Sequence, residues 1–335
     1  MRKTSLFFLS FSLLTCALAQ DIHFSQYNQS YLNLNPAATG QFDGDYRFNG
    51  NYRNQWSSIS EPFLTYSVSM EAKGLIKKLP QLDMGIVLYQ DEAGLGDLKT
   101  TNAMLSLAYS KKLNSDSTFL IRGGIQMGLL ARSINFQQFS FDRQYQNGGF
   151  DSNLDNGEDF VRDGFSSFNF NAGIASEYRI EQRKSFTLGF SLFNLSQPNQ
   201  SFQGSNIPLD LRSTFYLSSD YYLSEKMDLL PSILYSRQGK FKETVIGSNL
   251  RYRMSSSGFY KRNVYGGVWY RNADAIIVST GMDYNQWQVG LSYDINISDL
   301  DVASNNRGGL EIAVTYIFKE FKPIIRRYKV CPKFL

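Results

Sequence analysis

The sequence predicts an all-β protein, an antiparallel transmembrane β-barrel of fourteen strands with a short N-terminal plug. Fourteen segments alternate apolar and polar residues, and none shows the helical period that a parallel α/β domain needs. The mean hydropathy is −0.30, although 15% of residues are aromatic, and no run of the mature chain approaches the ~18 apolar residues of a helical span. A soluble sandwich alternates in the same way, but long strands without a domain break favour one membrane barrel.

The clearest strand is residues 287–298, WQVGLSYDINIS, in which every odd position is apolar and the positions between are polar or glycine. At ~3.3 Å per residue the segment spans roughly 40 Å, and a tilt of about 40° reduces this to roughly 30 Å, enough to cross an outer-membrane apolar band. Glycines within strands suggest a crowded or strongly curved sheet. The other predicted strands are 46–56, 62–72, 83–91, 101–112, 118–131, 168–178, 185–195, 211–223, 229–238, 243–253, 262–271, 274–284 and 310–318.

Residues 1–19 have the pattern of a signal peptide: two cations, an apolar run from 6 to 14, and Ala17-Leu18-Ala19 at the cleavage site. A lipoprotein that uses Cys16 is the alternative. The mature chain would keep one cysteine, Cys331, and one histidine, His23, too few for an internal disulfide, an imidazole or thiolate metal site, or a Ser-His-Asp triad. We therefore expect no cofactor and no enzymatic activity.

Residues 20–45 precede the first strand and are predicted to plug the lumen. Asn35 is a helix-cap residue, Pro36 fits the first helical position, Ala37 continues the turn, and Gly40 can end it. This turn chemistry argues against a strand. The barrel is predicted to span residues 46–318.

Two long connections do not fit strands. Residues 137–164 are polar and acidic, which indicates an extracellular loop. Within them DSNLDNGEDFVR (151–162) partly matches a calcium loop, but Asn156 occupies the expected glycine position and Arg162 replaces the bidentate glutamate. Residues 196–210 form a second loop, uncharged until Asp210.

The last segment, residues 319–335, is strongly basic. A solvated tail is one interpretation. The other is a periplasmic contact strip, because Ile324, Ile325, Val330 and Phe334 supply apolar anchors that a solvated tail does not need. Its contact candidates are Arg326, Arg327, Cys331, Pro332 and Phe334.

The N-terminal region resembles the PorP/SprF family of type IX secretion and gliding-motility outer-membrane proteins. The similarity rests on HFSQY (23–27), NPAATG (35–40) and YRNQW (52–56) in this order, and on CPKF (331–334) near the end. Asn35-Pro36-Ala37 is also similar to the hatch of FadL-like barrels. The resemblance implies a FadL-like, fourteen-stranded barrel in the outer membrane of a Bacteroidota-type bacterium.

The resemblance also implies partners: other components of the secretion and gliding apparatus, and a secreted adhesin or its C-terminal domain, beside outer-membrane lipid. The formal charge of +4 does not suggest a nucleic-acid partner. The leading hypothesis is a non-enzymatic barrel that docks or anchors surface proteins. The alternative is a FadL-like passive channel or a porin, although the inward positions are mostly Gly, Ser, Thr, Asn and Gln rather than opposed charges.

Several residues have both a structural and a functional interpretation. His23 is expected to be a packed neutral residue rather than a pH switch, and Trp56, Trp269 and Trp287 are expected in the interfacial aromatic belts. Arg53 is expected to pair with a carboxylate in the lumen and hold the plug. The plug and interaction candidates are His23, Phe24, Gln26, Tyr27, Asn35, Pro36, Ala37, Gly40, Arg53 and Trp56.

Overall fold

The computed structural model describes residues 21–55, 61–94, 96–114, 116, 118–146, 148–158, 160–257, 260–298 and 305–320. The predicted signal peptide at 1–19, the candidate Trp56 and the tail candidates Arg326, Arg327, Cys331, Pro332 and Phe334 lie outside these ranges.

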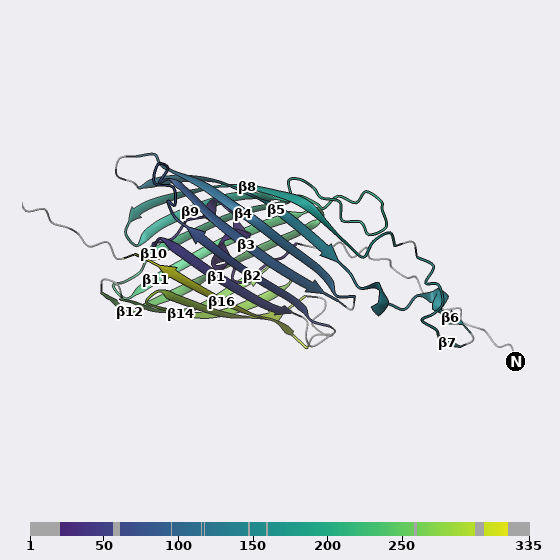
Figure 1. Ribbon diagram of the computed structural model, residues 1–335. Coiled ribbons are helices and arrows are strands. Elements are labelled where there is room, and N and C mark those ends of the chain that lie inside the picture. Colours follow the sequence, from purple (N-terminus) through teal and green to yellow (C-terminus); the bar gives the residue numbers. More distant parts are fainter. Residues whose placement is uncertain are drawn as a thin grey trace, which may run out of the picture.

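Fourteen antiparallel strands form one closed barrel in which β1 pairs with both β2 and β16 (Figure 1). The predicted fold class is confirmed, and each predicted segment overlaps one strand. Observed strands differ from predicted ones mainly at their ends, where polar residues continue the ladder. The strands are β1 Tyr46–Gln55, β2 Phe63–Ala72, β3 Leu82–Ala93, β4 Leu98–Lys112, β5 Phe119–Ser133, β8 Gly164–Glu181, β9 Lys184–Phe193, β10 Arg212–Tyr222, β11 Met227–Gln238, β12 Phe241–Ser257, β13 Tyr260–Arg271, β14 Ala275–Tyr284, β15 Trp287–Asn296 and β16 Arg307–Phe318.

The alternation of the sequence separates an apolar outer face from a polar interior. In β15, Trp287, Leu291 and Tyr293 are exposed, whereas Ser292 and Asp294 between them are buried. The other strands present exposed apolar side chains in the same way, which is the outer band of a membrane barrel. Among the described residues no helix is long and apolar enough to cross a membrane.

The barrel has two unlike ends. The turn end is where β1 begins and β16 finishes, and the connections there are short, the longest being residues 73–81. The loop end holds the long connections at residues 134–163 and 194–211. The first of these contains η3 Phe136–Gln138, η4 Asp142–Gln144 and a hairpin of β6 Tyr145–Gln146 and β7 Gly149–Phe150, which projects beyond the barrel (Figure 1). This hairpin was not predicted from the sequence.

Residues 21–45 cross the interior from the loop end to the turn end before β1 begins; we call residues 21–42 the plug. Asp21 N donates to Gln238 Oε1 (2.8 Å) at the loop end, and Asp45 N donates to Phe318 O (2.9 Å) at the turn end. Between them the plug forms η1 Tyr27–Gln29, α1 Tyr31–Leu34 and η2 Pro36–Ala38. The plug therefore occupies the lumen along its length.

Two expectations about the wall are wrong. Trp269 is not in an interfacial belt, because its side chain is 4% exposed and faces the lumen, whereas Trp287 is exposed on the outer face. The expectation that the inward face lacks opposed charges is also wrong: alongside many Ser, Thr, Asn and Gln residues, the interior buries a set of charged side chains that includes Arg47, Arg53, Glu71, Arg122, Arg212, Arg271, Asp294 and Glu311.

Candidate functional site

The plug is built around the capped turn that the sequence predicts. Asn35 is extended, its Oδ1 accepts a hydrogen bond from Ala37 N (2.8 Å), and Pro36 takes the first position of η2. Gly40 follows with a φ of +74°, which suits a residue without a Cβ. Asn35 Nδ2 donates to Ile174 O (3.0 Å), so the cap residue also joins the turn to β8.

Small residues of the wall let the turn lie against the sheet. A Cβ added to Gly124 on β5 would lie 2.4 Å from the Pro36 carbonyl carbon, and one added to Gly173 on β8 would lie 2.1 Å from Asn35 Oδ1. On the other side of the barrel, a Cβ on Gly290 would meet Gln26 Oε1 at 2.2 Å. The glycines within these strands therefore allow close approach of the plug, of its backbone at Gly124 and of its side chains at Gly173 and Gly290.

At the loop end two carboxylates hold the plug, Glu311 through the plug backbone and Asp294 through the Ser25 hydroxyl, an arrangement that we call the loop-end clasp. Ser25 N and Gln26 N donate to the two carboxylate oxygens of Glu311 on β16 (2.7 and 2.9 Å). Arg53 on β1 donates to the same carboxylate (3.1 Å) and to Asp294 on β15 (3.0 Å). All three charged residues are at most 3% exposed, and their charges are compensated by one another and by the plug.

Arg271 and His23 complete the loop-end clasp. Arg271 on β13 donates to Asp294 (2.9 Å) and to Ser25 Oγ (2.6 Å). His23 Nε2 lies 3.5 Å from Arg53 Nη2. Burial, and then the positive charges of Arg53, Arg271 and Arg212, lower the pKa of His23 well below 6.5, so its imidazole is neutral at pH 7.

At the turn end a second set of contacts, the turn-end clasp, holds the other end of the plug. Arg47 on β1 pairs side-on with Glu71 on β2, with N–O distances of 2.7 and 2.8 Å. Gly40 N donates to the same carboxylate (2.9 Å), and the Arg47 guanidinium lies 3.7 Å above the centre of the Tyr31 ring. Both clasps thus use an arginine of β1, six residues apart and on the inward face.

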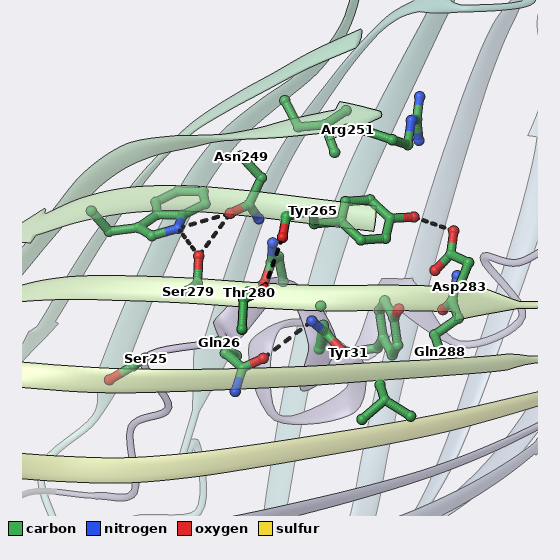
Figure 2. Close-up of a pocket in the computed structure, with 16 residues that line it drawn as sticks. Ser25, Gln26, Tyr31, Asn249, Arg251, Tyr265, Ser279, Thr280, Asp283 and Gln288 are labelled. Atoms are coloured by element: carbon green, nitrogen blue, oxygen red, sulfur yellow. Dashed lines mark hydrogen bonds between the residues drawn. The ribbon is translucent and has the colours of Figure 1, made fainter. Parts of the chain in front are cut away.

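Between the clasps a cavity of about 150 Å³ lies between the plug and β12–β15 (Figure 2). The Tyr27 ring meets Trp269 edge to face at 5.7 Å, and Tyr27 OH donates to Ser232 Oγ (2.9 Å). Trp269 Nε1 donates to Ser279 Oγ (3.2 Å), and Tyr265 is hydrogen-bonded to Asp283. Among the residues that line the cavity, Trp269 and Tyr265 supply aromatic rings, and each is hydrogen-bonded to a polar side chain of β14.

Most predicted plug candidates meet in this arrangement. His23, Phe24, Gln26, Tyr27, Asn35, Pro36, Ala37 and Gly40 lie along the plug, and Arg53 forms ion pairs with lumen carboxylates. Sequence reasoning missed Arg47, Glu71, Arg271, Asp294 and Glu311. Asp294 and Glu311 occupy the polar positions of the two most clearly alternating strands, and a charge at such a position in a neutral face was an available signal.

The long loops at the loop end are joined by stacked phenylalanines, which we call the loop cap. Phe160 stacks on Phe136 with ring centres 3.6 Å apart, and Phe202 meets Phe136 edge-on at 5.9 Å. Phe202 also contacts Phe165 (5.3 Å), beneath the guanidinium of Arg162. Within the part of the chain that the structure describes, which excludes Asp159, no three His, Cys, Asp or Glu residues could hold a metal ion.

Residues 17–316 match the family model described as "Type IX secretion system membrane protein PorP/SprF". This range includes the plug and nearly the whole barrel. No curated protein sequence is significantly similar to the chain.

Several solved barrels share the fold at low sequence identity. The toluene transporter TbuX of Ralstonia pickettii is 10% identical, with 87% of this chain and 94% of that chain covered and a TM-score of 0.51. The toluene transporter TodX of Pseudomonas putida is 11% identical, with coverage of 86% and 93% and a TM-score of 0.51. A Pseudomonas aeruginosa FadL homologue is 10% identical, with coverage of 87% and 94% and a TM-score of 0.50. The fold is therefore FadL-like.

Proposed function

The chain belongs to the PorP/SprF family of type IX secretion system membrane proteins, and from this premise we propose that it is a non-enzymatic outer-membrane barrel that docks or anchors secreted surface proteins. Its action is contact rather than chemistry. The turn end contacts components of the secretion and gliding machinery, and the loop end contacts the passenger, an adhesin or its C-terminal domain.

The observation that carries this proposal is the pair of clasps. A passive channel needs a free path through the lumen, whereas this lumen is crossed by a plug whose backbone is bound to buried carboxylates near both ends. Breaking a buried ion pair costs about 3–5 kcal/mol. A barrel closed in this way is better suited to present its two ends than to pass solutes.

The two ends differ as a docking element requires. Outer-membrane barrels place short turns in the periplasm and long loops outside, which assigns the turn end to the periplasm and the loop end to the cell surface. The loop cap joins residues of two separate loops into one aromatic cluster beside the exposed Val161. Aromatic clusters supply much of the binding energy of protein interfaces.

The machinery contact is tested by deleting residues 322–335 and measuring barrel abundance in the outer membrane separately from adhesin display at the surface. We expect normal abundance with lost display. The matched control keeps the charges by Lys329→Arg and Lys333→Arg and should display normally. Unchanged display after the deletion would exclude a contact role for the tail.

The passenger contact is tested at the loop cap. Phe160→Ala with Phe202→Ala removes stacked rings and should reduce co-purification of secreted proteins with the barrel, while Val161→Ala, 71% exposed in the wild type, serves as the control. Equal recovery of secreted proteins from both variants would contradict a role for the loop cap.

The second candidate function is a FadL-like passive channel for hydrophobic or small solutes. It is favoured by the fold shared with two toluene transporters. Solute uptake by cells that carry only this barrel tests it. Uptake that needs the barrel, together with adhesin display that does not, would select the channel over the docking role.

The proposal includes export and cleavage near Ala19 in a Bacteroidota-type envelope. The N-terminus of the purified protein tests this point, because cleavage after Ala19 leaves Gln20 as the first residue. Mass spectrometry that finds Met1 would contradict it.

A further inference from the structure

A large basic pocket opens at the turn end, outside both clasps. Its volume is about 960 Å³, near the upper end of the ~300–1,000 Å³ range of ligand pockets. Its lining includes five cationic side chains from four separate parts of the chain: Lys73 after β2, Lys111 and Lys112 on β4, Arg122 on β5 and Arg179 on β8. The strands β2, β3, β4, β5 and β8 lie side by side in the sheet in this order, which brings these side chains together.

The acidic side chains of the lining do not neutralise these cations. The lining contains Asp43 and Glu177. Glu177 pairs with Arg179, and Asp43 pairs with Lys319 outside the lining (2.8 Å). Lys73, Lys111 and Lys112 form no ion pair with any residue that the structure describes, so the pocket keeps a net positive charge.

Arg122 supplies a buried cation at the pocket wall with unused donors. Its residue is 6% exposed, its nearest carboxylate oxygen, on Asp83, is 3.5 Å from Nη1, and its Nε has no hydrogen-bond partner. The guanidinium of Arg47 on β1, by contrast, donates to Glu71 at 2.7 and 2.8 Å. A buried guanidinium with open donors is a site for a carboxylate or phosphate.

We propose that this pocket binds an acidic peptide segment of a periplasmic component of the machinery, with Arg122 receiving one carboxylate and Lys73 and Lys112 receiving others. The inference rests on the proposed function for the class of partner and on the assignment of the turn end to the periplasm. Binding of the peptide itself depends only on the residues of the pocket.

Charge and position favour a peptide over the other anions. The chain's own residues 321–335 are basic and by charge would not compensate the pocket. Arg122, Arg179 and Glu177 are on the inward side of the strands, so the floor of the pocket faces the lumen mouth rather than the bilayer. Several separate cations suit several carboxylates along one chain better than a single phosphate.

The test uses the purified full chain in a non-ionic detergent with fluorescein-labelled hexaglutamate as the probe. We expect saturable binding that weakens as salt rises, because the lysines are exposed. The double variant Lys73→Gln with Lys112→Gln removes two exposed charge pairs with the probe, and its affinity for hexaglutamate should fall about tenfold. Lys240→Gln with Lys242→Gln, which removes the same charge at the loop end, should bind like the wild type.

Two further arms decide the chemistry of the ligand. Arg122→Gln should weaken hexaglutamate binding, whereas Arg122→Lys should keep most of it. Electrophoresis of unheated samples checks that the barrel is still closed in both variants, because a closed barrel resists unfolding by the detergent of the gel. Equal binding by the turn-end and loop-end variants would overturn the proposal. So would failure of hexaglutamate to bind where inorganic phosphate or vesicles of phosphatidylglycerol do.

The outcome is separable from that of the proposed function. If hexaglutamate binds at the pocket but cells without the barrel still display their adhesins, the docking role fails and the pocket stands. If display needs the barrel but hexaglutamate binds equally to all variants, the pocket fails and the docking role stands.

Discussion

At the scale of single residues, the loop-end clasp decides where the plug sits. Arg53 and Glu311 are cross-strand neighbours at the place where the first and last strands meet, and both also bind Ser25. The Arg53 side chain therefore links β1 to β16 and also links the barrel to the plug. A change here should release the plug before it harms the barrel, whose ladders are held by many independent bonds.

Arg53→Gln should expose the plug because it leaves the buried Glu311 carboxylate without its arginine and leaves Asp294 with Arg271 alone, a cost of about 3–5 kcal/mol. The measurement is the rate at which a water-soluble maleimide labels Ala38→Cys, 3% exposed in the wild type, in a Cys331→Ser background. Arg307→Gln, an exposed position on β16, is the control and should leave labelling slow. Slow labelling in both variants would show that the clasp does not hold the plug.

Acid should loosen the plug through His23. Its pKa is lowered in the folded chain, so the neutral imidazole contributes fully to stability above the unfolded pKa of 6.5. Stability falls as the pH drops below 6.5, because the unfolded state then binds more protons than the folded state. Labelling of Ala38→Cys between pH 8 and pH 5.5, corrected for the reactivity of the thiol itself, should rise in acid.

His23→Asn cannot be protonated and is the control for this titration. Arg53, Arg271 and Arg212 stay charged throughout this pH range, and His23, whose pKa is lowered in the clasp, gains its proton when the plug is released. The same rise in labelling in His23→Asn would assign the effect to another group.

At the scale of elements, the strands and the capped turn followed from the sequence because both are local. Alternation needs only neighbours, and the Asn35 cap needs Ala37. Glu311 and Ser25 are 286 residues apart, and no local pattern connects them. Trp269 was misassigned because β13 is apolar on both faces there: Val268 and Tyr270 point outward beside it.

Gly124→Ala should push η2 away from β5, because the new Cβ would lie 2.4–2.5 Å from backbone atoms of Pro36 and Ala37. Overpacking of this kind costs about 1–3 kcal/mol. Gly123→Ala is the matched control, one residue earlier on the same strand with no atom within 4 Å of its Cβ. Faster labelling of Ala38→Cys is expected in the first variant, and equal labelling in both would refute the contact.

At the scale of the whole molecule, the two candidate functions differ in whether the plug must move. Thr39 Oγ1 and Ser106 Oγ on β4 are 2.7 Å apart, so Thr39→Cys with Ser106→Cys can form a disulfide that locks the plug to the wall. In a Cys331→Ser background the locked barrel should display adhesins at the wild-type level.

Solute uptake is the second measurement made on the same disulfide-locked barrel. A channel would lose uptake when locked and regain it when a reductant opens the disulfide. Display that is lost on locking and restored by reductant would show instead that docking requires plug movement, contrary to the rigid arrangement proposed above.

The path of the plug also has a consequence for how the molecule assembles. The lumen segment comes first in the chain, yet its strongest partners, Arg53 and Glu311, stand on the two strands whose pairing closes the cylinder. Threading a segment into a finished cylinder would strip water from these charges with nothing yet to replace it. Closure around a segment already in place avoids that barrier. We therefore expect the first and last strands to pair around a plug that already lies between them.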